Sequence, residues 1–306
     1  MTGTPPYACL ILHAKAAGRD DLRAAVATIR NQGFTTDVRV TWESGDATRF
    51  AREAADAGCA VVIAGGGDGT VNEVVRGLAD AASATTALPS LAVLPLGTAN
   101  DLARACNIPL DPFAALQLAV TAHAVDVDVG RANRRWFLNV ATGGFGTQVT
   151  VATPNRLKKI LGSAAYLVTG LTHFTSIKAA HARVSGPNLK WDGAFLVLAV
   201  GNGRQAGGGH QLCPEALIND GLLDVRLLPR SPDEEITDVL DALLREGMDA
   251  VRRTIVSARV PWLEIESDEV IQINLDGEPI ADTHFRFESV TGQLRMKLPP
   301  GCPLLG

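Results

Sequence analysis

The sequence has few aromatic residues and no strong excess of charge. Aromatic side chains make up 5% of the 306 residues, whereas 46% are hydrophobic. Because Ala, Val and Leu are prominent among them, we expect helices packed on Val-rich parallel strands. A chain of this length is long enough for two domains. The net charge of −5 provides no long-range attraction for nucleic acid, so we expect no nucleic-acid partner.

The cysteines form no recognisable framework. All five are widely spaced, and neither a CxxC motif nor a Cys/His pair at metal-ligand spacing occurs. Long apolar runs are also missing, since no segment reaches the roughly 20 residues of a membrane-spanning helix. The first apolar run, at residues 10–12, has no basic region ahead of it, unlike a signal peptide. We therefore expect a cytoplasmic protein that makes only transient, peripheral contact with a membrane.

The pattern of elements changes near residue 130. Up to about Asp128, short apolar runs alternate with helical stretches, which is typical of a parallel sheet covered by helices on both faces. Beyond about Val129, strand-like runs separated by Gly, Pro and Asn follow one another, and two helical stretches at 155–171 and 233–252 interrupt them. We therefore predict an α/β domain over residues 1–130 and a β-rich, antiparallel domain over residues 131–293.

A glycine-rich loop, Gly65-Gly66-Gly67-Asp68-Gly69-Thr70, follows a predicted buried strand and leads into a predicted helix. Glycines let the backbone approach a phosphate closely, and a helix N-terminus directs N–H groups towards it. The loop is not a Walker A motif, because no Gly-Lys-Ser/Thr follows. An acidic residue here would repel phosphate, so Asp68 indicates Mg²⁺ in the site. The alternative is a tight turn with Asp68 as the helix cap.

A second loop, Gly97-Thr98-Ala99-Asn100-Asp101, also lies between a predicted strand and a predicted helix. The ends of parallel strands lie along one edge of a sheet, where ligands bind, so the two loops are predicted to share a site. Thr98 offers a hydroxyl group to a phosphate or ribose, and Asp101 offers a carboxylate. Alternatively, Thr98 caps the helix and Asp101 interacts with the helix dipole.

Together the two loops resemble the catalytic domain of the diacylglycerol kinase family. Further blocks, at residues 41–47, 141–146, 201–209, 212–223, 274–279 and 298–305, are similar to the bacterial YegS-type lipid kinases, so the resemblance spans nearly the whole chain. It implies a nucleotide-binding α/β domain, a β-sandwich-like second domain and an active site in the cleft between them. It also implies that residues 294–306 pack back on the first domain. The expected activity in phospholipid metabolism is transfer of the γ-phosphate of ATP to a hydroxyl group of a lipid such as phosphatidylglycerol or diacylglycerol.

The resemblance also implies roles for individual residues. The catalytic residues would be Glu278, as the base, and Asp68. A structural Mg²⁺ or Ca²⁺ would be held by the carbonyl groups of Leu217 and Leu222 and the carboxylate of Asp220. The residues expected to bind ATP are Thr41, Gly65, Gly66, Gly67, Asp68, Gly69, Thr70, Val71, Asn72, Glu73, Thr98 and Asp101. An acidic network of Asp68, Asp101 and Asp128 would hold the catalytic Mg²⁺.

One departure and two alternatives accompany this interpretation. Many relatives have Asn-Pro after the first strand, whereas this chain has His13-Ala14-Lys15. An NAD kinase would share the Gly-Gly-Asp-Gly loop, and a non-catalytic nucleotide or lipid sensor would bind ATP without turnover. The helical stretch at 155–171 has one apolar face flanked by basic residues, which suits either packing on its own domain or contact with an anionic bilayer. No stable protein partner is expected.

Overall fold

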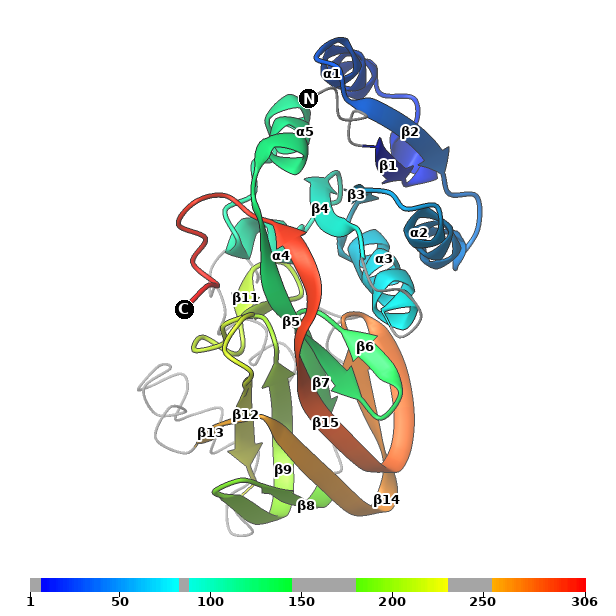
Figure 1. Cartoon of the computed structure of the whole chain (residues 1–306). Helices are drawn as coiled ribbons and strands as arrows, with labels where there is room; N and C mark the ends of the chain where they lie inside the picture. The colour runs from blue at the N-terminus through cyan, green and yellow to red at the C-terminus, as the bar shows by residue number, and fades with distance from the viewer. Residues whose placement is uncertain (1–6, 83–87, 145–179, 231–254) are drawn as a thin grey trace, which may run out of the picture.

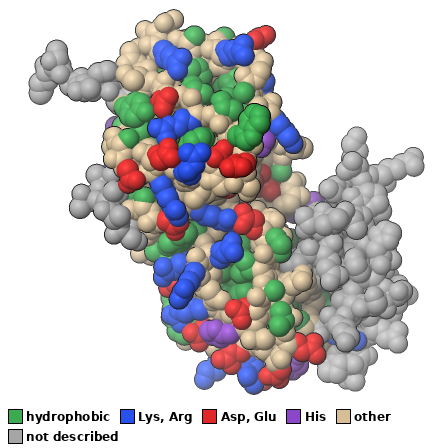
Figure 2. Space-filling model, turned by 90° about the vertical axis from the view of Figure 1, so that its right-hand side faces the viewer, with side chains coloured by type: hydrophobic (Ala, Val, Ile, Leu, Met, Phe, Trp, Pro, Cys, Tyr) green, Lys and Arg blue, Asp and Glu red, His purple; other side chains and the backbone are tan. Residues whose placement is uncertain are grey.

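The computed structural model describes residues 7–82, 88–144, 180–230 and 255–306 (Figure 1). The helical stretches predicted at 155–171 and 233–252 lie outside these residues. The fold has an α/β half followed by a β-rich half, so the predicted fold class is confirmed. Within the described residues, no helix is long and apolar enough to cross a membrane. Basic and acidic side chains are interspersed over the face shown in Figure 2.

The first half is built on four parallel strands in the order β4-β3-β1-β2. These are β1 (Tyr7–Leu12), β2 (Thr35–Val40), β3 (Val61–Gly66) and β4 (Ser90–Pro95). Every residue of β3 and β4 is buried, as expected for central strands that carry helices on both faces. The sheet therefore presents the ends of β3 and β4, and the loops that follow them, at the same edge.

The helices of this half are η1 (Ala14–Ala16), α1 (Asp20–Asn31), α2 (Asp46–Asp56), α3 (Asp68–Ala81), α4 (Asp101–Ala105) and α5 (Pro112–Thr121). Alternate residues of the strands point to opposite faces, so two cores form. Leu10 lies in the core that contains α1 and α5, whereas the adjacent Ile11 lies in the core that contains α2 and α3.

The second half is antiparallel and has its own core around Phe137, Phe285 and Phe287. Its strands are β5 (Ala124–Ala132), β6 (Arg135–Phe137), β7 (Val140–Gly144), β8 (Ala180–Gly186), β9 (Leu189–Gly201), β12 (Leu223–Pro229), β13 (Val256–Val260), β14 (Trp262–Leu275) and β15 (Glu278–Lys297). A short hairpin of β10 (Gln205–Ala206) and β11 (His210–Gln211) forms a separate two-stranded sheet.

The long strand β15 joins the two halves. Its first part pairs with β14, and its last part pairs with β5 and meets β4 at Met296, which is in register with Leu91 (Figure 1). Apart from the β10–β11 hairpin, the described strands of both halves therefore form one hydrogen-bonded network, although the second half has its own core. Met296, Leu298 and Leu304 lie in the core that contains α2 and α3, so the end of the chain packs with elements of the first half.

Candidate active site

The two loops predicted to share a site are in contact. The N–H group of Leu96 donates to the carbonyl of Gly66 over 2.8 Å. A Cβ atom on Gly97 would overlap the backbone of Gly67, so the close approach requires glycine. Asn100, in the left-handed conformation, closes the second loop, because its side chain both accepts from the N–H and donates to the carbonyl of Gly97 over 2.9 Å. This asparagine, rather than Thr98, is the N-cap position of α4, and Thr98 is exposed.

The glycine loop presents the start of α3. Gly67 is the N-cap position and provides no side-chain cap, so the first N–H groups of the helix are available to a bound anion. A Cβ atom on Gly66 would overlap the hydroxyl oxygen of Thr70, which is itself buried. The next two residues, Val71 and Asn72, are also buried, and the N–H group of Val71 donates to the carbonyl of Gly67 over 3.1 Å, so contact with an anion is left to the N–H groups that precede Val71. Backbone rather than side chains therefore forms most of this predicted phosphate site.

The structure brings Asp68 and Asp101 together. Oδ1 of Asp68 accepts a long, 3.4 Å hydrogen bond from the N–H group of Leu102. Burial, and next the charge of Asp101, raise the pKa of Asp68 above its ordinary value. The Asp101 carboxylate accepts from the N–H groups of Gly208 and Gly209 over 3.0 and 2.6 Å, which ties the first half to a loop of the second. A partly buried carboxylate beside a second carboxylate, as Asp68 is, fits a site for a hard cation.

The Asp128 carboxylate is buried and is bound by two backbone donors. Its oxygens accept from the N–H groups of Gly221 and Gly292 over 2.7 and 2.9 Å, and the residue is 4% exposed. Among the described residues, no group of three or more His, Cys, Asp or Glu side chains is arranged to hold a metal ion. The Mg²⁺ network of Asp68, Asp101 and Asp128 therefore stays a prediction, and in this structure two backbone N–H groups bind the carboxylates of both Asp101 and Asp128.

A different carboxylate, that of Asp276, lies near Asp68. Burial raises its pKa to about 6, the charge of Asp68 adds to the rise, and three backbone hydrogen bonds oppose it. These come from the N–H groups of Leu138, Asn139 and Val140, at 2.6, 3.1 and 2.9 Å. Asp276 has a positive φ of 48° and begins the turn that leads to Glu278. The sequence pattern Asp-Gly at a strand end was its only signal.

Glu278 reaches from the second half to α3. Its Oε2 lies 2.6 Å from a guanidinium nitrogen of Arg76, which is 18% exposed at its side chain, and 3.9 Å from Arg135. The Glu278 side chain is 43% exposed. The ion pair positions the carboxylate at the junction of the two halves. To act as a base, Glu278 would exchange Arg76 for the hydroxyl group of a substrate.

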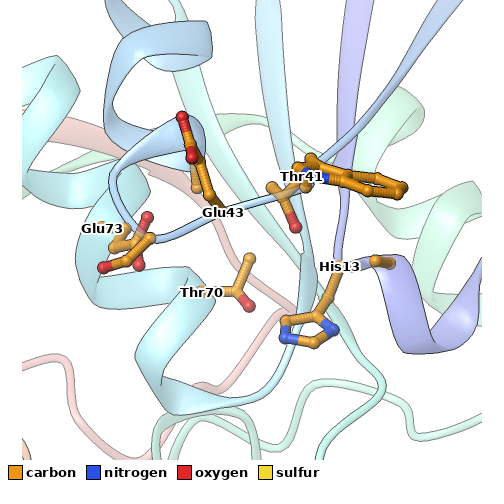
Figure 3. Close-up of a pocket in the computed structure, with 9 residues that line it drawn as sticks. His13, Thr41, Glu43, Thr70 and Glu73 are labelled. Atoms are coloured by element: carbon orange, nitrogen blue, oxygen red, sulfur yellow. The ribbon is translucent and has the colours of Figure 1, made fainter.

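A cavity of about 290 Å³ lies beside the glycine loop (Figure 3). Thr41, Thr70 and Glu73, all predicted to bind ATP, line it together with His13, Ala14, Trp42, Glu43, Ser44 and Ala47. Nδ1 of His13 accepts from the N–H group of Lys15 over 3.2 Å. Figure 3 shows Thr70 between the His13 ring and the carboxylate of Glu73, with Thr41 above them in this view. The cavity is lined by residues of the first half.

The residues predicted to hold a structural cation have a different partner in the structure. The Asp220 carboxylate accepts from the N–H group of Leu222 over 2.9 Å and forms an ion pair with Arg259. Nearby, Leu304 accepts from the N–H group of Ile218 over 2.9 Å. A guanidinium group therefore neutralises Asp220 in this structure, and the cation site of Leu217, Asp220 and Leu222 stays a prediction.

The chain is similar to known proteins along nearly its whole length. Residues 8–132 match the family model described as "Diacylglycerol kinase catalytic domain", and residues 139–298 match "YegS C-terminal NAD kinase beta sandwich-like domain". A "Probable lipid kinase YegS-like" from Pseudomonas aeruginosa is 53% identical over 296 residues, covering 97% of this chain and 95% of the relative. One of the same description from Stenotrophomonas maltophilia is 50% identical, covering 99% of both.

Solved structures agree with these matches. A "putative diacylglycerol kinase" from Bacillus anthracis has a TM-score of 0.78 at 25% identity and covers 99% of this chain and 98% of its own. Fold, loops and matches together define a kinase with a diacylglycerol-kinase catalytic domain. Within that class, the chain belongs to the YegS-like lipid kinase family. The family and the enzyme class predicted from the sequence are thus confirmed, and the family match favours a lipid kinase over an NAD kinase.

Proposed function

We propose that this chain is an ATP-dependent kinase that transfers the γ-phosphate to a hydroxyl group of a membrane lipid, such as phosphatidylglycerol or diacylglycerol. The observation that carries the proposal is the uncapped start of α3 behind the glycine loop, next to a cavity large enough to accept part of a nucleotide. Family membership supplies the substrate class. Phosphorylation of such a lipid would place the enzyme in phospholipid metabolism.

The phosphates of ATP would lie against the backbone N–H groups of residues 67–70, where the dipole of α3 favours negative charge. Thr41 and Thr70 line the adjoining cavity and would donate hydroxyl groups to the nucleotide. Exposed Thr98 would contact the phosphates from the second loop. These contacts bind and orient the donor, which accounts for much of the catalysis in phosphoryl transfer.

Asp68 would hold Mg²⁺, with Asp101 nearby. The ion, when bound, neutralises charge on the phosphates. The partly buried Asp68 carboxylate has the neighbouring negative charge of Asp101 and a long hydrogen bond from Leu102, so it has the donor chemistry that such an ion needs. Asp101, which accepts from Gly208 and Gly209, would keep the second half in place against this site.

Glu278 would accept the proton of the lipid hydroxyl group. A free hydroxyl group is a weak nucleophile at neutral pH, so a carboxylate within hydrogen-bond reach assists the attack. The position of Glu278 on β15, next to Asp276 and across from α3, brings such a carboxylate to the junction where the donor phosphates would lie.

The proposal includes the organisation and location of the protein. We place the domain division at about residue 130, with residues 294–306 belonging to the first domain, because Leu298 and Leu304 lie in its core. ATP as the donor and a membrane lipid as the acceptor require a cytoplasmic enzyme that touches the bilayer peripherally and transiently. No stable protein partner is proposed.

Incubation with radiolabelled ATP and Mg²⁺, using lipid vesicles, diacylglycerol micelles and NAD as separate acceptors, tests the proposal. We expect a labelled lipid, no labelled NAD, and loss of labelling in Asp68→Asn. The matched control is Asp126→Asn, which removes an exposed carboxylate on β5 that pairs with Arg295. ATP binding without labelling of any lipid would support the sensor alternative, and labelled NAD would support an NAD kinase.

A further inference from the structure

Trp42 has an unusual position for a tryptophan. Its side chain is 92% exposed, the largest exposure of any big hydrophobic side chain in the described part of the chain. Indole rings usually bury most of their surface, because their apolar area is large. Trp42 nevertheless lines the cavity beside the glycine loop. An apolar ring at the edge of a binding cavity provides a surface for a flat ligand.

The backbone that carries this ring is held firmly. The N–H groups of Trp42 and Glu43 donate to Oδ2 of Asp46 over 2.7 and 3.1 Å, and Arg49 binds the other oxygen of that carboxylate over 2.7 Å. The hydrogen bond from Trp42, followed by that from Arg49, lowers the pKa of Asp46 to about 2, so these contacts persist across the physiological range. The exposure of the ring is therefore a property of an ordered loop.

The same loop is tied to α3. The N–H group of Gly45 donates to Oε2 of Glu73 over 3.1 Å, and the hydroxyl group of Thr48 donates to the carbonyl of Glu73 over 2.9 Å. The distance between the Trp42 loop and the start of α3 is thus set by direct contacts. A ligand that binds both would meet two preformed surfaces, which reduces the entropic cost of binding.

The charges around the cavity favour one orientation of a bound nucleotide. The start of α3, near Thr70, favours an anion, whereas the carboxylates of Glu43 and Glu73 repel one (Figure 3). Carboxylates instead accept hydrogen bonds from the hydroxyl groups of a ribose. A nucleotide bound here would place its phosphates at the glycine loop and its nucleoside end towards Glu43 and Trp42.

We propose that Trp42 is the platform on which the nucleobase of the donor stacks. This inference rests on the proposed function, since it needs a nucleotide at the glycine loop. Every base has a flat π-face, so the indole ring contributes affinity without strong selection between bases. A role as a membrane anchor suits the site less well, because the adjacent carboxylates would be repelled by an anionic bilayer.

Calorimetric titration of the full chain with Mg²⁺–ATP and, separately, with Mg²⁺–tripolyphosphate tests the inference. We expect Trp42→Ala to weaken ATP binding by about tenfold or more and to leave tripolyphosphate binding within about twofold. Trp42→Phe should retain most of the ATP affinity, because it keeps an aromatic face. Phe113→Ala, which truncates another exposed aromatic side chain on α5, is the matched control and should bind both ligands as wild type does.

Several outcomes would overturn the inference. Wild-type affinity for ATP in both Trp42 variants would do so, and so would equal weakening towards ATP and tripolyphosphate, which would indicate a disturbed loop. Loss of binding to phosphatidylglycerol vesicles with unchanged ATP affinity would make Trp42 a membrane anchor. If the wild-type protein bound ATP no more tightly than tripolyphosphate, the stacking proposal would be refuted, whereas the phosphate site would still be supported. If wild type bound neither ligand, the proposed function itself would fail and this inference with it.

Discussion

Replacing Glu278 by Gln removes the carboxylate that would accept a proton and preserves the size of the side chain. The lost ion pair with Arg76 joins a mostly buried guanidinium group, whose side chain is 18% exposed, to a carboxylate that is 43% exposed. Because Gln keeps an oxygen that can accept from the mostly buried Arg76, we expect the lost charge to lower the free energy of unfolding by about 1–3 kcal/mol. For a chain of this size, each kcal/mol corresponds to a decrease in melting temperature of about 2–4 °C. The variant should therefore remain folded at assay temperature.

We expect kcat of Glu278→Gln to fall by at least about a hundredfold, because removing a general base typically costs a factor of about 10² to 10⁴. The KM for ATP should change by less than about twofold, since the glycine loop is untouched. The measurement is transfer of label from ATP at saturating lipid, with the melting temperature recorded in parallel.

A matched control lies on the same strand. Glu288 of β15 pairs with Arg131 over 2.6 Å and is 27% exposed, so Glu288→Gln removes a comparable ion pair away from the junction. It should keep kcat near that of wild type. Near-normal kcat in Glu278→Gln, or an equal loss in Glu288→Gln, would refute the assignment of Glu278 as the base. A defect confined to the KM for ATP would make Glu278 a nucleotide contact instead.

Three further predictions concern stability. Gly66→Ala should lower the free energy of unfolding in urea by about 1–3 kcal/mol, because the added Cβ overlaps a buried side chain, whereas Gly69→Ala, with open space around it, should not; equal effects would contradict this packing. The pKa of Asp276 is raised from 3.8 to about 6, so between these pH values the native state binds more protons than the unfolded state. The free energy of unfolding, measured by urea titration at each pH, should therefore rise by up to about 3 kcal/mol as the pH falls from 7 to 4, and Asp276→Asn should lack this rise. Since Arg259 already neutralises Asp220, millimolar Mg²⁺ or Ca²⁺ without nucleotide should not raise the melting temperature, and a rise that Asp220→Ala abolishes would support the structural-cation site.

The interpretation of the glycine loops needed little beyond local sequence. A predicted strand followed by Gly65-Gly66-Gly67-Asp68-Gly69-Thr70 indicates a loop whose backbone can approach a ligand closely and which leads into a helix. In the structure α3 begins at Asp68. The alternation of strands and helices likewise predicted the parallel sheet, because βαβ connections constrain neighbouring strands. The change to consecutive strands beyond residue 130 predicted the antiparallel half. These features depend on residues that are close in the chain.

Hydrogen-bond partners that lie far apart in the sequence could not be predicted in the same way. Asp68, Asp101 and Asp128 looked equivalent in the sequence, yet two backbone N–H groups bind each of the carboxylates of Asp101 and Asp128, whereas the N–H group of Leu102 lies 3.4 Å from Asp68. Nothing in the local pattern distinguishes a carboxylate that meets two backbone donors from one that does not. Trp42 was visible only as part of a motif, and its exposure at the cavity depends on the packing of loops from three different strands.

The sequence by itself determined the family, the α/β and β-rich halves and the chemistry of the glycine loop, since each depends on residue type and short-range spacing. Tertiary structure alone decided that Gly67 touches Gly97, that Glu278 meets Arg76, and that Asp276 receives three N–H groups from residues 138–140. The path of β15 brings residues from opposite ends of the chain together at this junction. Burial there sets which carboxylates remain available, because desolvation and backbone donors act only in the folded chain.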